Sequence, residues 1–333
     1  MKILVAMPQG EIRDLFLPPA NIERLQELGE VKVNPMSRHY TREELSELLR
    51  EVDAAVTGWG CEAIGKEVLG DGRYPGIVAH TGGTVAPYTD EGTFRKGIHV
   101  VSANKLYAKS VAEGTLAYML AGMRRIPYWT RKMYSGGWQE PGYRNYGLFG
   151  KRVGLTGYGE ITRNLIPLLH VFETEILLYS GHMTEAECEK IGVKKASLEE
   201  IFSTCDIVSV HNSSTKANRN LVDDRLLKML KKDALFINTS RGAVIDEQAL
   251  ARRLKEGDFT AVLDVYQREP LAEESPLRGL DNVYLMPHMG GPTTDLYAKC
   301  AAAVIEDIRR FRDGEPLLHE IRPDKVKHMT QSM

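Results

Sequence analysis

Three side chains that can bind an acid or move a proton each follow a short apolar run typical of a buried strand. They are Arg241, Glu269 and His288. A guanidinium is a permanently charged, planar donor that suits carboxylate and carbonyl oxygens. An imidazole can give or take a proton near neutral pH. Because open α/β sheets place their sites at the carboxyl ends of strands, we expect these three side chains to share one site.

Taken singly, each of these residues also has an ordinary structural interpretation. Arg241 can pair with Asp246, and Glu269 before a proline is typical of a solvated turn. A histidine after a proline, such as His288, is commonly a loop residue. Their joint occurrence at three strand ends favours the catalytic interpretation.

A glycine turn follows the predicted strand at 152–156 and opens a helix. Gly157 permits a tight turn, and Gly159 lets the backbone approach a pyrophosphate at the positive end of that helix. Thr162 replaces the third glycine of the usual G-x-G-x-x-G pattern, which puts close packing of the helix on the strand in question. The residues expected to contact a dinucleotide here are Gly157, Tyr158, Gly159, Glu160 and Ile161.

The end of the next predicted strand bears on the choice between NAD and NADP. An NAD site normally carries Asp or Glu about 20 residues after the first glycine, where it binds the ribose 2′-hydroxyl. Ser180 occupies that place and cannot repel a 2′-phosphate, and His182 can pair with one. We therefore expect Ser180 and His182 to contact the cofactor and NADP to be at least tolerated. The alternative is that Ser180 only weakens the binding of NAD.

Three motifs surround the charged side chains. They read N-T-S-R-G at 238–242, L-D-V-Y-Q-R-E-P at 263–270 and P-H-M-G-G at 287–291. In this order and spacing the chain resembles the D-isomer-specific 2-hydroxyacid dehydrogenase family, which includes phosphoglycerate dehydrogenase and hydroxypyruvate reductase. The resemblance covers nearly the whole chain, and the motifs are specific when taken together.

The resemblance implies an oxidoreductase that transfers a hydride between NAD(P) and a D-2-hydroxy acid or 2-oxo acid. It implies that Arg241 grips the substrate oxygens and that His288 gives the proton to the carbonyl oxygen. Glu269 would orient the imidazole and favour its charged form. Asp264 is expected to contact the nicotinamide amide, as the family's Asp does.

Further cofactor contacts are expected from the resemblance. His211 corresponds to a family histidine near the cofactor, but Ser213 replaces the proline that normally follows it. We therefore expect His211 to form a wall of the cofactor site and not to act as the acid. The remaining expected cofactor contacts are Asn212, Thr239, Ser240 and Gly290.

The substrate loop of the family corresponds to Thr81, Gly82 and Gly83, although the usual G-x-G-x-D-N wording is absent. Consecutive glycines can present backbone N–H groups to an anion, and the alternative is an ordinary tight turn. We expect Trp59 and this loop, together with Arg241 and His288, to bind the substrate. Gly114 stands where the family usually has a histidine.

Short β-rich runs alternate with amphipathic stretches along the chain, which predicts parallel sheets covered by helices. Thr41 and Glu44 have the spacing of a capping box and predict a helix start. We expect α/β architecture with two doubly wound parallel sheets, a Rossmann-type cofactor domain at 105–293 and a flavodoxin-like substrate domain at 1–104 and 294–333. Long helices are predicted at 109–133 and 295–312. The predicted strands are 3–6, 31–33, 54–57, 77–79, 99–102, 152–156, 176–179, 207–211, 235–238, 261–265 and 283–286.

Composition limits the function classes. The 333 residues include 43 Lys and Arg against 45 Asp and Glu, a net charge of −2, which gives no basic excess for nucleic acid or anionic lipid. No apolar stretch approaches the roughly 18 residues of a membrane span. The four scattered cysteines predict reduced thiols and no metal site, so we expect a cytoplasmic protein. The resemblance adds the expectation of a homodimer.

Rival functions differ in the residues they need. Formate oxidation in the family uses Gln where Glu269 stands, so this residue argues against it. A phosphite-type dehydrogenase keeps Arg, Glu and His and stays open. A non-catalytic NAD(P)-binding sensor, like some corepressor relatives, also stays open because the glycine motif is incomplete.

Overall fold

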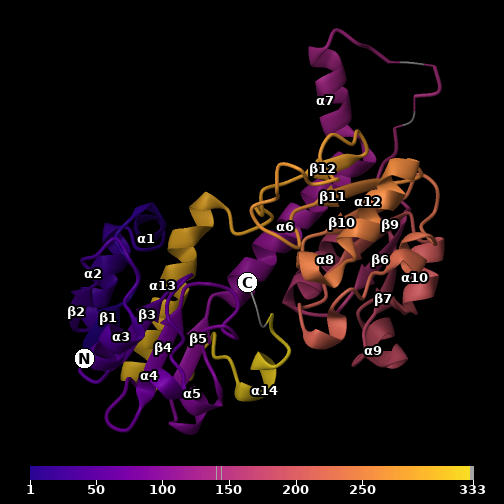
Figure 1. Cartoon of the computed structure of the whole chain (residues 1–333). Helices are drawn as coiled ribbons and strands as arrows, with labels where there is room; N and C mark the ends of the chain where they lie inside the picture. The colour runs from indigo at the N-terminus through magenta and orange to yellow at the C-terminus, as the bar shows by residue number, and fades with distance from the viewer. Residues whose placement is uncertain (140, 144, 331–333) are drawn as a thin grey trace. The chain divides into compact units, whose positions relative to one another are not determined.

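The computed structural model describes residues 1–139, 141–143 and 145–330. The chain divides into two compact units, Met1–Tyr107 with Pro292–Met333, and Ala108–Gly291. We call them unit 1 and unit 2, and the boundary falls within helix α6 (Asn104–Met123) (Figure 1).

Unit 1 is built on a five-stranded parallel sheet of order β2-β1-β3-β4-β5. This is the flavodoxin-like order of a doubly wound sheet. Its strands are β1 (Lys2–Val5), β2 (Glu30–Val33), β3 (Ala54–Thr57), β4 (Ile77–His80) and β5 (His99–Ser102). Its helices are α1 (Glu11–Phe16), α2 (Pro19–Leu28), α3 (Arg42–Leu49), α4 (Lys66–Leu69), α5 (Glu91–Arg95), α13 (Tyr297–Arg312) and α14 (Pro323–Val326), with a short 3₁₀ turn η3 (Thr294–Leu296).

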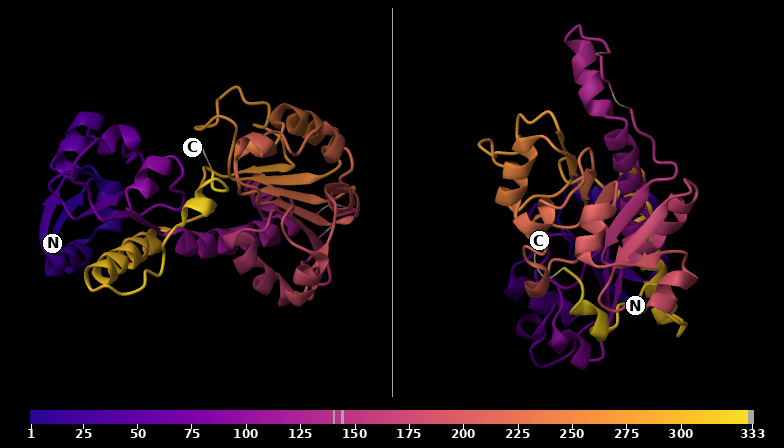
Figure 2. Two further views of the ribbon diagram at one scale, coloured as in Figure 1. Left: turned by 90° about the horizontal axis from the view of Figure 1, so that it is seen from below. Right: turned by 90° about the vertical axis from the view of Figure 1, so that its right-hand side faces the viewer.

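Alternating side chains place an apolar cluster on each face of this sheet. Ile3 of β1 packs in one cluster with helices α1, α2 and α13, whereas Leu4 packs in the other with α3 and α4. The left-hand view of Figure 2 shows α13 lying beside this sheet. The expected capping box opens α3, since Thr41 Oγ1 accepts from Glu44 N at 3.3 Å and Glu44 Oε2 accepts from Thr41 N at 2.8 Å.

Unit 2 is built on a seven-stranded parallel sheet of order β12-β11-β10-β9-β6-β7-β8. The order reverses between β6 and β9, as in a Rossmann sheet. Its strands are β6 (Arg152–Thr156), β7 (Glu175–Tyr179), β8 (Lys194–Lys195), β9 (Ile207–Val210), β10 (Leu235–Asn238), β11 (Thr260–Leu263) and β12 (Val283–Leu285). Its helices are α7 (Ile126–Tyr134), α8 (Glu160–His170), α9 (Glu185–Lys190), α10 (Leu198–Thr204), α11 (Asp224–Leu227) and α12 (Glu247–Glu256), with 3₁₀ turns η1 (Lys216–Asn218) and η2 (Gly242–Val244).

Helices cover both faces of this sheet as well (Figure 2). One apolar cluster joins α10, α11 and α12 to the strands through residues such as Phe202 and Phe236. The other joins α6 and α8 to the opposite face through Met119 and Leu165. Strands buried on both faces explain why these segments read as continuous apolar runs. The predicted α/β class with two doubly wound parallel sheets is confirmed.

The prediction of one helix over 109–133 is wrong. α6 ends at Met123, and α7 begins at Ile126 after Arg125 adopts a left-handed φ of 52°. Pro127 has no N–H to donate to the carbonyl four residues earlier, and its ring would clash with that carbonyl. The apolar periodicity continues across this break and so conceals it. The two-residue strand β8 also lacked a recognisable sequence pattern, because both its residues are exposed lysines.

Candidate active site

The glycine turn of unit 2 lies at the point where its strand order reverses. Gly157 has a φ of 88°, and a Cβ on it would stand 3.0 Å from the carbonyl oxygen of His211, just after β9. The turn therefore needs glycine both for its conformation and for this close approach. Thr162 is fully buried and donates from Oγ1 to the carbonyl oxygen of Gly157 at 2.8 Å. A hydrogen bond to the turn thus takes the place of the third glycine.

Three buried polar atoms around this turn have no hydrogen-bond partner among the described residues. They are Oγ1 of Thr156, Nδ1 of His211 and Oδ1 of Asn212. His211 uses its other ring nitrogen to contact Ser209 Oγ at 2.9 Å, and burial lowers its pKa to about 4, so the ring is neutral at pH 7. Polar atoms left unpaired at a glycine turn at a switch point fit a dinucleotide that would supply their partners.

The end of β7 carries a hydroxyl and a ring in place of a carboxylate. Ser180 is buried, and its Oγ lies 3.3 Å from Nδ1 of His182. The aromatic ring of Tyr158 lies 6.2 Å from that imidazole and 4.6 Å from the guanidinium carbon of Arg163. Arg163 on α8 is therefore a cation near the end of β7, and no sequence motif marks it.

The segment after β10 is a hydrogen-bonded turn that presents Arg241. The side chain of Asn238 accepts from Ser240 N at 3.0 Å and from Ser240 Oγ at 2.8 Å, and it donates to Arg241 O at 3.2 Å. Thr239 Oγ1 lies 3.1 Å from Thr115 Oγ1 of α6. Asn238 therefore shapes the turn, and the fixed asparagine of the N-T-S-R-G motif was the signal that could have identified it.

Gly242 brings the turn after β10 against the segment after β11. A Cβ on Gly242 would stand 1.9 Å from the backbone carbon of Tyr266, which no side chain could occupy. Tyr266 in turn donates its N–H to Glu269 Oε1 at 3.0 Å. The glycine of the motif thus sets the spacing between Arg241 and Glu269.

His288 and Glu269 are in direct contact. Nδ1 of His288 lies 2.6 Å from Glu269 Oε2, which fixes the ring and leaves Nε2 as the nitrogen able to reach a substrate. His288 has a left-handed φ of 51°, a conformation that a non-glycine residue adopts at an energetic cost and that clusters at functional sites.

Asp264 holds the loop that follows His288. Its Oδ1 accepts from Met289 N at 2.8 Å and from the Tyr118 hydroxyl at 3.1 Å, and its Oδ2 accepts from Gly290 N at 2.9 Å. The carboxylate is almost fully buried, so these bonds have little competition from water. Tyr118 carries no motif of its own, so no sequence signal marked it as part of the site.

The carboxylates also act on Arg241. Burial lowers the pKa of this guanidinium, and the nearby Glu269 and Asp264 carboxylates oppose that shift. Its Nη1 donates to Ser240 O at 2.7 Å. Since arginine stays charged in proteins, this side chain is a cation held beside the His288–Glu269 pair. The structure therefore brings the guanidinium, the carboxylate and the imidazole of the three motifs together.

Helix α6 packs closely on the loop that holds His288. A Cβ on Gly114 would stand 2.4 Å from the carbonyl oxygen of Gly290, and a Cβ on Gly291 would stand 2.9 Å from Val111 N. This approach explains why glycine occupies position 114 in this chain.

In unit 1 the predicted substrate loop follows β4. Ser102 Oγ donates to the carbonyl oxygens of Gly82 at 3.0 Å and Gly83 at 2.7 Å. In trans peptides this orientation turns the N–H groups of Gly83 and Thr84 the opposite way. His80 at the end of β4 is buried, and Nδ1 contacts Thr57 Oγ1 at 2.9 Å while Nε2 has no partner among the described residues. Trp59, after β3, has Nε1 3.0 Å from the position of a Cβ on Gly82.

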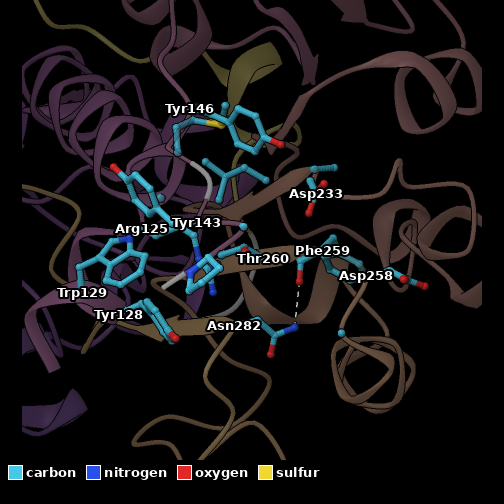
Figure 3. Close-up of a pocket in the computed structure, with 17 residues that line it drawn as sticks. Arg125, Tyr128, Trp129, Tyr143, Tyr146, Asp233, Asp258, Phe259, Thr260 and Asn282 are labelled. Carbon is cyan, nitrogen blue, oxygen red and sulfur yellow. Dashed lines mark hydrogen bonds between the residues drawn. The ribbon is translucent and has the colours of Figure 1, made fainter. Parts of the chain in front are cut away.

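A cavity of about 320 Å³ lies at the amino ends of the strands of the seven-stranded sheet, where β10 and β11 begin. Figure 3 shows Arg125, Trp129 and Tyr143 on one side of it and Asp258, Thr260 and Asn282 on another. It is distinct from the strand ends that carry Arg241 and His288.

Over the described residues, no cluster of three or more His, Cys, Asp or Glu could hold a metal ion, and no described helix is long and apolar enough to cross a membrane.

Comparison with known proteins identifies the family. Residues 116–290 match the family described as D-isomer specific 2-hydroxyacid dehydrogenase, NAD binding domain. The chain is 31% identical over 317 residues to D-3-phosphoglycerate dehydrogenase of Methanocaldococcus jannaschii, covering 95% of this chain but 58% of that protein. It is 31% identical over 307 residues to glyoxylate reductase of Pyrococcus furiosus, covering 90% of this chain and 91% of that protein.

Solved structures agree on the fold. An acyclic imino acid reductase in complex with NADPH and D-Arg has a TM-score of 0.80 at 24% identity, covering 97% of this chain and 100% of that one. A glyoxylate reductase from Paecilomyes thermophila has a TM-score of 0.78 at 23% identity, covering 97% and 98%. The chain belongs to the D-isomer specific 2-hydroxyacid dehydrogenase family, a family of NAD-dependent oxidoreductases that act on CH–OH groups. The predicted family, and with it the class of enzyme, is confirmed.

Proposed function

We propose that this protein reduces a 2-oxo acid to the D-2-hydroxy acid, and catalyses the reverse oxidation, with Arg241, Glu269 and His288 as its catalytic residues. The observation that carries the proposal is the 2.6 Å contact between His288 Nδ1 and Glu269 Oε2, with the Arg241 guanidinium held nearby. This is the arrangement that proton transfer to a carbonyl oxygen needs.

Each residue has a distinct task in the reduction. When bound, the nicotinamide supplies the hydride for the carbonyl carbon. Arg241 binds the carboxylate and carbonyl oxygens and stabilises the charge that develops on the carbonyl oxygen. His288 gives the Nε2 proton to that oxygen, which completes the hydroxyl group and leaves a neutral ring. Glu269 keeps the ring oriented through its contact with Nδ1 of His288.

We further propose that the cofactor lies along the turn after β6, and that NADPH is accepted as well as NADH. Support comes from the unpaired atoms of Thr156, His211 and Asn212 at this turn. At the end of β7, Ser180 and His182 present no carboxylate to a 2′-phosphate. Asp264, already engaged by Met289, Gly290 and Tyr118, has one lone pair left, on Oδ2, for a nicotinamide amide.

We assign the substrate carboxylate to the loop at Thr81, Gly82 and Gly83, with Trp59 beside it, and we propose a substrate domain in unit 1 and a cofactor domain in unit 2. The N–H groups of Gly83 and Thr84, which point away from Ser102, are adjacent backbone donors of the kind that bind anions. Neither Gly83 N nor Thr84 N donates a hydrogen bond to any described residue.

We propose a homodimer formed through the segment Ile126–Gln139, which we call the projecting segment. It contains α7, no residue of which is buried, and it extends away from the rest of unit 2 (Figure 1). Tyr134 and Trp138 are 89% and 70% exposed. A nine-residue helix with exposed aromatic side chains is only marginally stable in water by itself. A second copy of the chain would cover these side chains.

The decisive experiment follows cofactor absorbance with a panel of 2-oxo acids, each with NADH and with NADPH. Wild type should turn over at least one acid. His288→Ala should lower turnover about 10²- to 10⁴-fold while NADH binding, measured by fluorescence, is retained. Wild-type turnover in that variant would refute the assignment of the proton donor.

A further inference from the structure

A cavity of about 310 Å³ opens at the carboxyl edge of the sheet of unit 1. The loop after β1 lines it together with Trp59, which follows β3. β1 and β3 are the neighbours at which the order of this sheet reverses, and doubly wound sheets bind ligands at such points. Apolar side chains form much of the lining, namely those of Met7, Pro8, Ile12 and Trp59.

The cavity adjoins the proposed carboxylate loop. The indole of Trp59 lines the cavity, and its Nε1 lies 3.0 Å from the position of a Cβ on Gly82. Met7 makes a second connection, because its Sδ lies 3.9 Å from Thr81 Oγ1. An acid whose carboxylate is bound by this loop therefore lies next to the cavity.

The charges around the cavity do not suit a phosphate. Its one arginine, Arg13, is engaged, since Nη1 donates to Asn34 O at 2.8 Å and Nε lies 3.7 Å from Asp14 Oδ1. Glu11 adds an exposed carboxylate. Burial lowers the pKa of His39, so this ring is neutral at pH 7. Within the described lining, a phosphate would meet the carboxylate of Glu11, and the only cation there, Arg13, is already paired.

We propose that this cavity binds the side chain of the substrate, and that the preferred substrate is a 2-oxo acid with an uncharged, apolar side chain of several carbon atoms, branched or aromatic. The proposal rests on the proposed function and makes it more specific. A volume of about 310 Å³ falls at the lower end of the ~300–1,000 Å³ typical of ligand pockets, so a side chain of this size has room. Glyoxylate, which has no side chain, would leave the apolar lining in contact with water.

The first test compares kcat/KM for 4-methyl-2-oxopentanoate, phenylpyruvate, glyoxylate and 3-phosphohydroxypyruvate with the full-length protein. At least one of the two apolar acids should exceed both glyoxylate and the phosphorylated acid by ~10-fold or more, since single methylenes in apolar pockets already discriminate by such factors. Preference for glyoxylate or for the phosphorylated acid would overturn this proposal and leave the proposed function standing. Turnover of no acid would contradict the proposed function itself and this proposal with it.

Ile12 allows a second test, because it lines the cavity yet is 48% exposed and so tolerates larger side chains. Ile12→Trp should lower the ratio of kcat/KM for phenylpyruvate to that for glyoxylate by ~10-fold. Ile12→Lys should raise the ratio for 3-phosphohydroxypyruvate to phenylpyruvate by a similar factor, because it adds a free cation. Leu318→Trp and Leu318→Lys are the matched controls, since Leu318 is 46% exposed in the same unit and outside the lining. Unchanged ratios in both Ile12 variants would overturn the proposal.

Discussion

The two carboxylate oxygens of Glu269 hold different partners: Oε1 accepts from the backbone N–H of Tyr266 at 3.0 Å, while Oε2 lies 2.6 Å from Nδ1 of His288. The carboxylate is therefore fixed by its own loop before it orients the imidazole. Glu269 therefore has the task of orienting the ring, whereas His288 transfers the proton. A substitution of Glu269 alone can test the first task.

Glu269→Gln should retain the hydrogen-bond geometry but lose the negative charge beside the ring. We expect kcat/KM for 2-oxo acid reduction to fall about 10²-fold while the KM for NADH stays near its wild-type value, because the imidazole loses the carboxylate that orients it. Steady-state kinetics with each substrate varied in turn measures both values. Glu247→Gln is the control, since Glu247 accepts from Gln267 N at 2.9 Å and is not hydrogen-bonded to His288. A fall in kcat/KM no larger than that of Glu247→Gln would contradict the proposed role.

Ser180→Asp should convert the end of β7 into an NAD-type site. A carboxylate there repels a 2′-phosphate and accepts from the ribose hydroxyls, so the KM for NADPH should rise at least ~10-fold relative to that for NADH. Steady-state kinetics with each cofactor provides the measurement. Ser46→Asp on α3 adds the same charge elsewhere and should leave the ratio as it is. An unchanged ratio in Ser180→Asp would show that this residue does not face the ribose.

Replacing aromatic side chains of the projecting segment should change the oligomeric state. If two copies bury these surfaces, Tyr134→Asp combined with Trp138→Asp places charges in an apolar contact and should shift the mass from two chains to one. Sedimentation or light scattering at micromolar concentration measures this mass. Val171→Asp, at a residue 71% exposed outside the segment, should remain dimeric. A wild-type mass of one chain across the concentration range would contradict the dimer.

Much of unit 2 could be predicted because its strands are continuous apolar runs that end in motif residues, so Arg241, Glu269 and His288 were placed at strand ends correctly. The sequence did not show where the backbone changes direction or which loops lie close together. Nothing in the apolar pattern distinguishes a helix that continues past Arg125 from one that turns there. Likewise, the hydroxyl of Tyr118 can be recognised as part of the site only from the fold, which places it 3.1 Å from Asp264 Oδ1. Periodicity reports burial, whereas the site depends on which loops approach one another.

Gly242 tests such an approach directly. Gly242→Ala places a methyl group where the backbone of Tyr266 lies, so the two loops must separate. We expect a loss of about 1–3 kcal/mol in the free energy of unfolding, the usual range for overpacking, together with reduced kcat. Urea denaturation and steady-state kinetics measure these effects. Gly147→Ala is the matched control, because no atom of the described residues lies within 4 Å of its Cβ position. Equal stability of the two variants would show that the loops can move apart freely.

His80 makes the stability of unit 1 depend on pH. Burial lowers its pKa to about 3 in the folded protein, whereas an unfolded histidine titrates near its ordinary value of 6.5. Between these values the unfolded chain binds a proton that the folded chain does not, so stability falls as pH falls from 6.5 toward 3. At pH 5 the loss from this one group amounts to about 2 kcal/mol. Urea unfolding at pH 7 and pH 5 should show a smaller pH-dependent loss in His80→Asn than in wild type, whatever the variant's stability at pH 7. His328→Asn, which removes an exposed imidazole, should keep the wild-type dependence. An identical loss in His80→Asn and wild type would mean that the buried ring takes up its proton without unfolding.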